Sequence, residues 1–555
     1  MNKTFSVIII SICCFAKFTV SSAQTDSMKN RILLDDVQHS EKIIGLQFNE
    51  AKNDSMLDAI NDQLHNYQSI RKVELKNNIP PAILFNPIPN GFKFPKSKKV
   101  LKISSVKKIK SPNNIEEVAF YTIPQLAQLI KTKKISSLQL TKMYISRLKK
   151  YDSQLHCVIT LTESLAVAQA KRADDELAKG KYRGLLHGIP YGAKDLLAQK
   201  DYKTTWGSVP FQEQVLHEDA TVVKKLEEAG AVLCAKFSVG ELAWGDVWFG
   251  GMTRNPWDTT QGSSGSSAGS ASATSAGLVA FAIGTETWGS IVSPSTQCGV
   301  TGLRPTYGRV SRKGTMALSW SMDKIGPICR TAEDCAIVFN AIYGVDGEDQ
   351  TLYDIPFSYT GNINFKKFRF GYIKNDFDSL KQNKNIADST LSILKQLGAT
   401  LIPVTLPKYP INDISIILTA EAGAAFDELT RNGGDDLMVR QIKDAWPNVF
   451  RASRFIPAVE YIQANRVRYI IIQEVQKIFD SIDVYVAPSF SDNLLLTNLT
   501  GHPCVVIPNG FTNDEHPTSI SFTGKLFDEE TILDIAKKFQ DVTDFHLKHP
   551  KQFLP

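Results

Sequence analysis

The chain has 555 residues, of which 43% are hydrophobic and 22% are charged, close to the averages of globular proteins. This composition excludes a chain that is disordered throughout, a collagen and a coiled coil. The 63 Lys and Arg and the 57 Asp and Glu give a net charge of +6, which is too weak over this length to indicate a nucleic-acid partner. We expect a large soluble globular protein.

The first 23 residues have the three parts of a secretory signal peptide. A short basic start precedes the apolar run 5–15, and small residues stand at Ser21 and Ala23, before the expected cleavage site. The run is too short to span a bilayer, and no later stretch is long enough to do so. A buried N-terminal helix or strand and a lipid anchor at Cys13 are the alternatives. The pattern predicts an exported protein, periplasmic or secreted, cleaved near Ala23.

Residues 24–115 are predicted to form an N-terminal extension that ends in a lysine-rich connector. Apolar residues at helical spacing predict a helix from Ser55 to about residue 70. Five prolines between residues 80 and 95 predict an extended connection. Residues 93–110 carry eight lysines and no acidic residue, which is typical of a solvated connector. A contact with an anionic surface is the alternative.

From residue 116 onward, helices alternate with short apolar strands. Apolar spacing predicts helices over 123–130, 137–148 and 164–177. A helix followed by a buried strand is predicted three times, at 221–230 and 231–235, at 389–397 and 400–404, and at 467–479 and 484–487. Such alternation predicts an α/β layered fold around a mostly parallel sheet.

One segment is built almost wholly of small residues. Between Gly262 and Gly277 only Thr274 is not Gly, Ser or Ala, and the apolar strand 278–283 follows at once. A flexible linker seldom runs directly into a core strand. We therefore expect this segment to pack tightly against neighbouring backbone and to present N–H groups to a reacting oxygen.

Two further features surround that segment in the sequence. The turn 284–290 is bracketed by glycines and ends in Ser290, and Lys194 stands upstream among apolar and small residues. Lys194 is either a surface residue or a buried base, because burial lowers the pKa of an amine and leaves a neutral form that accepts a proton.

These segments resemble the amidase signature family. The matching pieces, in the order that this family has, are GIPYGAKD at 188–195, NP at 255–256, GSSAGSASATSAGL at 265–278, GTETWGSI at 284–291, CGVTGLRPTYGRVSRKG at 298–314 and MDKIGPICRTAEDCA at 322–336. Ser266 and Ser290 are 24 residues apart, the spacing in that family. The resemblance implies one amidase domain over 116–555, with a central mixed, mostly parallel sheet covered by helices on both faces. The amino-acid sequences of these motifs are most similar to those of the peptide and small-amide amidases of the family.

The resemblance also implies the catalytic residues. Ser290 matches the nucleophile, Ser266 matches the serine held on a cis peptide bond after Gly265, and Lys194 matches the lysine base. A serine hydroxyl needs a nearby base to become a good nucleophile. Neutral Lys194 would take a proton from Ser266, which takes one from Ser290, and the relay would run backwards to protonate the leaving amine.

The oxyanion of the tetrahedral intermediate would be bound by the backbone N–H groups of Thr287, Trp288, Gly289 and Ser290. Trp288 replaces the first of two glycines that the family usually has before the nucleophile, and Ala268 replaces another glycine. Neither change removes a catalytic group. The Trp288 indole either wedges into the core or walls the acyl pocket, and we favour the wall.

The resulting functional prediction is an amide hydrolase. It cleaves a small-molecule or peptide amide to a carboxylic acid plus ammonia or an amine, through an acyl-enzyme on Ser290, with no cofactor, metal or nucleic-acid partner. The catalytic A-type subunit of an aminoacyl-tRNA amidotransferase is the first alternative, which the export signal disfavours. A non-catalytic binding protein with the same fold is the second, which the complete triad disfavours.

Other patterns in the sequence favour different functions less well. Residues 265–269 also fit the G-x-S-x-G elbow of α/β-hydrolases, with Ser267 as nucleophile, but no apolar strand directly precedes them. The nine histidines form no HExxH or HxH pattern. We expect His546 and His549 to be solvated and His187 to be a packing or loop residue. Asp195 either orients Lys194 or caps local structure.

The cysteines do not suggest a disulfide framework. Six of the eight follow residue 23, and none belongs to a C-x-x-C pair. Most have apolar or small neighbours, which predicts buried free thiols.

Overall fold

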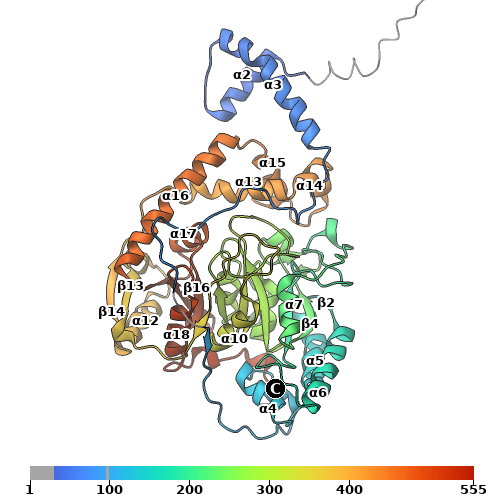
Figure 1. Cartoon of the computed structure of the whole chain (residues 1–555), viewed down its shortest axis with the longest axis vertical. Helices are drawn as coiled ribbons and strands as arrows, with labels where there is room; N and C mark the ends of the chain where they lie inside the picture. Colours follow the sequence, from blue (N-terminus) through green and yellow to red (C-terminus); the bar gives the residue numbers. More distant parts are fainter. Residues whose placement is uncertain (1–30, 96–98) are drawn as a thin grey trace, which may run out of the picture. The chain divides into compact units, whose positions relative to one another are not determined.

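The computed structural model describes residues 31–95 and 99–555, so the signal peptide predicted for 1–23 lies outside the described residues. The chain divides into two units, Met1–Lys76 and Asn77–Pro555. The described part of the first unit holds two helices, α2 (Leu34–Ile44) and α3 (Glu50–Ile70) (Figure 1). The helix predicted from Ser55 is confirmed, and it begins earlier because the Asn49 side chain caps it by accepting a hydrogen bond from the Lys52 N–H.

The lysine-rich connector belongs to the second unit. Its short strand β1 (Val100–Leu101) pairs in parallel with β12 (Ser358–Tyr359). The lysines at 99, 102, 107, 108 and 110 are exposed, whereas the apolar residues between them are half-buried. The solvated lysines are thus confirmed in this part of the connector, which lies along the body as an extended segment.

An eleven-stranded sheet forms the centre of the second unit, in the order β14-β13-β15-β17-β16-β10-β11-β9-β3-β4-β2. Its strands are β2 (Val158–Leu161), β3 (Pro190–Lys194), β4 (Val232–Phe237), β9 (Phe281–Glu286), β10 (Thr301–Arg304), β11 (Lys324–Cys329), β13 (Arg369–Ile373), β14 (Thr400–Val404), β15 (Val484–Pro488), β16 (Cys504–Phe511) and β17 (Pro517–Gly524). Two short ribbons lie outside this sheet, β5 (Val247–Trp248) with β6 (Gly251–Met252) and β7 (Arg254–Asn255) with β8 (Asp258–Gly262).

The sheet is mixed, and its parallel pairings lie toward its two ends. β13 is parallel to β14 and β15, and β3 is parallel to β4 and β9. The six pairings that join the other strands are antiparallel. The predicted α/β class with a mixed sheet is confirmed, but parallel pairs are fewer than expected. Connections such as 512–516, between β16 and β17, are too short for the crossover that parallel strands need.

The helices of the second unit follow the predicted pattern. They are α4 (Ile123–Lys131), α5 (Ser137–Leu155), α6 (Glu163–Ala178), α7 (Thr221–Glu228), α8 (Ala268–Ser275), α9 (Val292–Cys298), α10 (Ala332–Ile342), α11 (Lys374–Ser379), α12 (Lys384–Gln396), α13 (Ile416–Ala425), α14 (Asp427–Arg431), α15 (Trp446–Ser453), α16 (Ala458–Ser481), α17 (Asp492–Thr500) and α18 (Glu529–Gln540). Every helix predicted after residue 116 is present, although α16 begins nine residues before the predicted start at 467.

Both faces of the sheet are buried. On β9, Phe281 and Ile283 pack into one apolar cluster with residues of α4, α7, α10 and α18. Ala282, which points to the opposite face, packs with residues of α6 and α8. This alternation is the period of two that a strand imposes on its side chains. Helices therefore cover both faces, as predicted.

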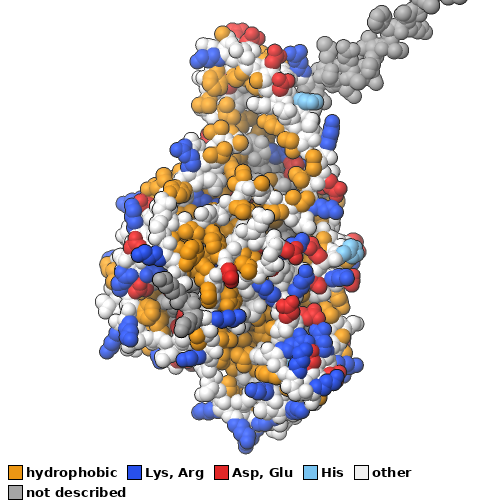
Figure 2. Space-filling view, viewed as in Figure 1, with side chains coloured by type: hydrophobic (Ala, Val, Ile, Leu, Met, Phe, Trp, Pro, Cys, Tyr) orange, Lys and Arg blue, Asp and Glu red, His pale blue; other side chains and the backbone are white. Residues whose placement is uncertain are grey.

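The surface and the cysteines agree with the composition. Lys and Arg side chains are spread over the face in view, and many have Asp or Glu beside them (Figure 2). The six cysteines from Cys157 to Cys504 are free and buried, as predicted. Within residues 31–95 and 99–555, no helix has both the length and the hydrophobicity to cross a membrane.

Candidate active site

Two neighbouring strands bring the predicted site residues to one edge of the sheet. β3 and β9 are parallel and in register, with Tyr191 opposite Phe281 and Ala193 opposite Ile283. The carboxyl ends of parallel strands meet at the same edge. Lys194 is the last residue of β3, and the turn that ends in Ser290 directly follows β9.

Lys194 is fully buried among hydroxyl groups. Its Nζ lies 2.8 Å from Ser266 Oγ, 2.8 Å from Thr285 Oγ1 and 3.1 Å from Ser267 Oγ. Burial lowers the pKa of Lys194 well below its usual value, although the carboxylates of Asp323 and Glu286 oppose the shift. Lys194 is therefore a buried amine that favours the neutral form, and the surface alternative is excluded.

The hydrogen bonds of Ser267 show how a neutral amine fits these hydroxyls. Ser267 Oγ donates its proton to the Thr285 carbonyl oxygen (3.0 Å) and accepts from the Thr285 N–H (3.1 Å). Toward Lys194 it can therefore only accept. A neutral amine has two N–H donors and one lone pair. The lone pair of Nζ is left for the hydroxyl proton of Ser266 or Thr285.

Ser266 lies in a backbone segment that is packed without free space. The Gly265–Ser266 peptide bond is cis, as the family resemblance implied. A Cβ at Gly265 would lie 1.8 Å from the Gly245 carbonyl oxygen, so no other residue fits there. The next residue, Ser267, donates its N–H to the Ser290 carbonyl oxygen at 3.1 Å, which ties this segment to the turn after β9.

The turn after β9 presents unpaired donors. The N–H groups of Thr287, Trp288, Gly289 and Ser290 donate to no other residue among those described. Gly289 has φ +85°, a conformation that L side chains rarely adopt. The Ser290 side chain is 8% exposed, and its Oγ has no hydrogen-bond partner in the described chain. The turn thus holds an accessible hydroxyl beside free backbone donors.

A buried carboxylate that the sequence analysis did not single out braces this turn. Glu286 Oε2 accepts hydrogen bonds from the N–H groups of Ile291 (2.8 Å) and Val292 (2.9 Å), which directly follow Ser290. Its other oxygen pairs with Arg304 at 2.8 Å, and both side chains are fully buried. Burial opposes the charge of Glu286, but Arg304 and the backbone donors outweigh it, so its pKa is lowered.

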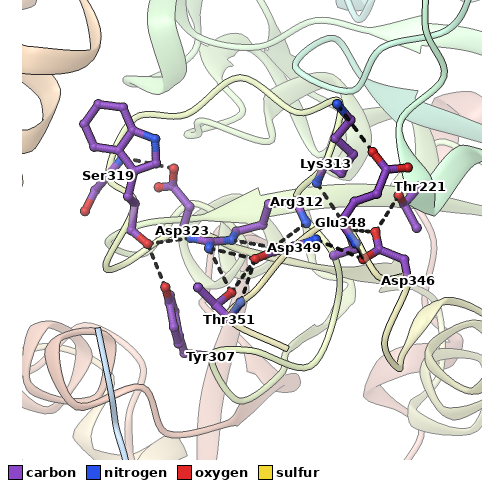
Figure 3. Close-up of polar contacts among 12 residues, drawn as sticks. Thr221, Tyr307, Arg312, Lys313, Ser319, Asp323, Asp346, Glu348, Asp349 and Thr351 are labelled. Atoms are coloured by element: carbon purple, nitrogen blue, oxygen red, sulfur yellow. Dashed lines mark hydrogen bonds and ion pairs between the residues drawn. The ribbon is translucent and has the colours of Figure 1, made fainter. Parts of the chain in front are cut away.

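A second carboxylate holds the turn from the other side. Thr287 Oγ1 donates to Asp323 Oδ1 at 2.5 Å. Asp323 Oδ2 accepts from the N–H groups of Leu318 (2.8 Å) and Ser319 (2.9 Å), as Figure 3 shows for Ser319. Burial raises the pKa of Asp323, and these hydrogen bonds oppose the shift. Glu286 and Arg304 are each the last residue of a buried strand, and a charged residue at such a position in GTETWGSI and GLRP is the sequence signal that could have identified them.

The structure also decides between the open alternatives. Asp195 pairs with Lys236 at 2.7 Å and accepts from the Thr205 N–H, so it caps local structure and makes no hydrogen bond to Lys194. His187 is buried and contacts the Ala173 carbonyl oxygen, as a packing residue would. Ser267 is fully buried, so it is not the exposed nucleophile of an α/β-hydrolase elbow.

One expectation is corrected. His549 stacks on Phe120, with 4.2 Å between the ring centroids, and His549 and His546 are both half-buried rather than solvated. Of the two alternatives for the Trp288 indole, placement in the core, which we did not favour, is excluded because Trp288 is 44% exposed. Over residues 31–95 and 99–555, no group of three or more His, Cys, Asp and Glu is placed to hold a metal ion.

Known proteins resemble the chain over most of its length. The family model described as Amidase matches residues 139–495. The A-type subunit of glutamyl-tRNA(Gln) amidotransferase from Coxiella burnetii is 34% identical over 483 residues, covering 78% of this chain and 99% of that protein. The corresponding protein of Carboxydothermus hydrogenoformans is 32% identical over 487 residues, covering 78% of this chain and 100% of that protein.

Solved structures agree. The native peptide amidase of Stenotrophomonas maltophilia superposes with a TM-score of 0.68 at 26% identity, over 77% of this chain and 97% of that one. The A-type subunit of glutamyl-tRNA(Gln) amidotransferase from Thermotoga maritima gives a TM-score of 0.66 at 26% identity, over 78% and 96%.

These relatives overturn the prediction of an exported protein. The two relatives compared in sequence above are named as subunits of an amidotransferase for glutamyl-tRNA(Gln). Because aminoacyl-tRNA is a molecule of protein synthesis inside cells, periplasmic or secreted localisation is not what the relatives indicate, and that prediction is wrong.

Family membership follows from three findings. They are the match of the family model, the relatives whose length the chain covers almost completely, and the shared fold. The chain belongs to the Amidase family and is an amidase-signature hydrolase.

Proposed function

We propose that the chain hydrolyses a carboxamide through an acyl-enzyme on Ser290. Ser290 Oγ attacks the carbonyl carbon, its proton passes to Ser266 Oγ, and the Ser266 proton passes to Lys194 Nζ. The C–N bond then breaks, and the relay returns a proton to the departing ammonia or amine. Water attacks the resulting ester in the same way and releases the carboxylic acid.

The observation that carries this proposal is the environment of Lys194. A buried amine, 2.8 Å from Ser266 Oγ and with a pKa far below its usual value, is what a general base at neutral pH requires. The unpaired N–H groups of Thr287, Trp288 and Gly289 add donors for the oxyanion. Thr287 is held by Asp323 and the turn by Glu286, so these donors are fixed before the substrate binds.

The test is release of ammonia from a panel of carboxamides by the purified full chain. The panel runs from short aliphatic amides to C-terminally amidated peptides and glutamine. With hydroxylamine present, an acyl-enzyme is intercepted as a hydroxamate, and mass spectrometry of denatured protein locates the acyl group on Ser290. An acyl group on another serine, or turnover that survives in Ser290→Ala, would contradict the proposal.

A second candidate is the catalytic A-type subunit of an aminoacyl-tRNA amidotransferase. The curated relatives, at 32–34% identity, favour this function over that of an independent amidase. In that case the same site would cleave glutamine, and the ammonia would be used by partner subunits on an aminoacyl-tRNA. The discriminating experiment compares glutamine cleavage by the chain alone and with the remaining subunits of such an enzyme and its charged tRNA. Cleavage that requires the partners supports the second candidate.

A further inference from the structure

A cavity of about 540 Å³ lies beside the candidate active site. Its wall includes Thr285, whose hydroxyl contacts Lys194, and Thr287, whose N–H is one of the free donors. Leu196, Met316 and Leu318 line it as well. The cavity therefore borders the start of the turn that ends in Ser290, although Lys194, Ser266 and Ser290 do not themselves line it.

One wall of this cavity comes from the segment 77–86, which we call the strap and of which all residues except Ile79 and Asn86 line the cavity. Asn77 fixes its start, because its side chain donates to the Ala317 carbonyl oxygen (2.8 Å) and accepts from the Ala317 N–H (2.7 Å). Phe85 fixes its end. The Phe85 ring packs edge-on against Tyr307, with 5.1 Å between centroids, and the Arg468 guanidinium lies 3.5 Å from its centroid.

Between these two anchors, hydrogen bonds do not attach the strap to the rest of the described chain. Residues 78–84 make no hydrogen bond to any other part of the chain that the structure describes. Ile83 and Leu84 line the cavity and remain 78% and 47% exposed. Ile79, in the same stretch, is 47% exposed but does not line the cavity. The strap thus offers apolar side chains to the cavity that no protein group covers.

The charged groups around the cavity are paired within the protein. Arg312 pairs with Asp349 at 3.1 Å, and Lys313 lies 3.5 Å from Glu348 (Figure 3). Asp323 accepts hydrogen bonds from Thr287 and from two backbone N–H groups. Each of these charges therefore already has a partner of opposite charge or a hydrogen-bond donor within the protein.

Lys324 completes the set of charged residues that line the cavity near the site. Its amine donates to the Met322 carbonyl oxygen. Burial, and after it the Arg304 guanidinium, lowers the pKa of Lys324 well below its usual value, so the amine favours the neutral form. The cavity therefore combines neutralised charges with the apolar side chains of the strap.

The strap lies outside the part of the chain that the family model matches, which begins at residue 139. Selectivity that comes from the strap would therefore be this chain's own property.

We propose that residues 77–86 form the apolar wall of an acyl-binding subsite, which selects amides whose acyl group is uncharged and apolar. This inference rests on the proposed function, because it assigns the acyl side of the same reaction. It also disfavours glutamine as a substrate, since the acyl end of glutamine carries an ammonium and a carboxylate, whereas the charges around this cavity are already paired within the protein.

The test uses Ile83→Ala/Leu84→Ala, with Ile79→Ala as the matched control from the same segment. kcat/KM is measured for acetamide, butanamide, hexanamide and glutamine with the full chain. The wild type should prefer hexanamide to acetamide and to glutamine. The double variant should lose about tenfold in kcat/KM for hexanamide, with little change for acetamide, because apolar contacts to the longer chain are lost. Ile79→Ala should retain the wild-type ratio.

Binding of hexanamide to Ser290→Ala, measured by calorimetry with and without the strap substitutions, separates the two proposals. If hexanamide binds Ser290→Ala in a way that depends on the strap, but the wild type turns over none of the amides, the strap inference is supported and the proposed hydrolysis is refuted. Three results would overturn the strap inference while leaving hydrolysis intact. They are turnover by the double variant with an unchanged ratio of kcat/KM for hexanamide to acetamide, an equal loss of kcat/KM for hexanamide in Ile79→Ala, and a preference of the wild type for glutamine. Neither binding nor turnover of apolar amides overturns both.

Discussion

Lys194 Nζ lies 2.8 Å from Ser266 Oγ, and both side chains are buried against the small-residue segment before α8. Lys194 is the last residue of β3, and Ser266 lies two residues before the start of α8. At this distance a proton moves along an existing hydrogen bond, provided that the lysine is neutral before the reaction starts.

Lys194→Arg should therefore be nearly as inactive as Lys194→Met, because arginine stays protonated and cannot accept a proton. For the wild type, kcat/KM should rise with pH as Lys194 loses its proton and then level off. The midpoint should lie far below the usual pKa of lysine, because burial lowers it. A pH–rate profile of all three proteins provides the measurement, and substantial activity in Lys194→Arg would refute the neutral-amine role.

The same shift has a consequence for stability. Between the lowered pKa of folded Lys194 and about 10.4, its value in an unfolded chain, the unfolded state binds more protons. The free energy of unfolding should thus rise with pH across this window, and it should rise less steeply in Lys194→Met.

Ser290→Ala should lower kcat by about 10⁶, as removal of the nucleophile does in other serine hydrolases. The fold should be unaffected, because Ser290 Oγ has no hydrogen-bond partner among the described residues. Steady-state kinetics and thermal unfolding of the same preparation test both statements. A smaller loss, of tenfold or less, would mean that another group attacks the substrate.

The features that could be predicted from the sequence are those that depend on residues close together in the chain. The helix periods and the strand at 231–235 could be predicted because each depends on neighbours in the chain, whereas the roles of Lys194, Ser266 and Ser290 were implied by the family resemblance. The Gly265 position could also be anticipated as a site of tight packing, although its partner, the Gly245 carbonyl oxygen, could not.

The remaining features depend on contacts between distant segments. Strand pairing in the middle of the sheet is antiparallel because of how β10, β11, β16 and β17 meet, which no local pattern reports. Glu286 meets Arg304 across the sheet, and the strap meets Tyr307 more than 200 residues away. Such pairs are set by tertiary structure, and although a charged residue in a strand can be noticed in the sequence, a single sequence does not say which distant residue it meets.

Glu286→Gln should weaken catalysis as well as the fold. It leaves Arg304 without its buried partner, which should cost about 3–5 kcal/mol of stability. It also loosens the turn after Ser290, and a displacement of about 1 Å at a reacting group can cost about 100-fold in rate.

Glu529→Gln is the matched control for this substitution. Glu529 forms a fully buried pair with Arg309 at 3.2 Å, and neither residue belongs to the candidate active site. Its stability loss should be similar, measured by denaturant unfolding, while kcat should change little. Equal losses of kcat in the two variants would show that Glu286 acts only through stability.

Gly265→Ala should destabilise the protein by about 3 kcal/mol, because the new Cβ would overlap the Gly245 carbonyl oxygen and the backbone around Ser266 would have to move. Activity should fall with it. Gly251→Ala is the comparison: Gly251 has φ +107° but open space around its Cβ, so only backbone strain of about 1–2 kcal/mol is expected, with normal kcat. Chemical denaturation and initial rates measure both effects.

Trp288→Ala should change stability by only about 1 kcal/mol. A buried tryptophan would leave a cavity costing about 3–5 kcal/mol, but this side chain is 44% exposed. Its backbone N–H, the predicted oxyanion donor, is retained in the variant, so kcat for small amides should stay near the wild-type value. The cavity beside Thr285 and Thr287 is not lined by Trp288. The preference among acyl chain lengths should therefore be unchanged, in contrast to the strap variant.

Thermal unfolding and kcat/KM over the acyl series measure both effects. A higher kcat/KM for long acyl chains in Trp288→Ala would instead assign the indole to the wall of the acyl pocket, as the sequence led us to expect.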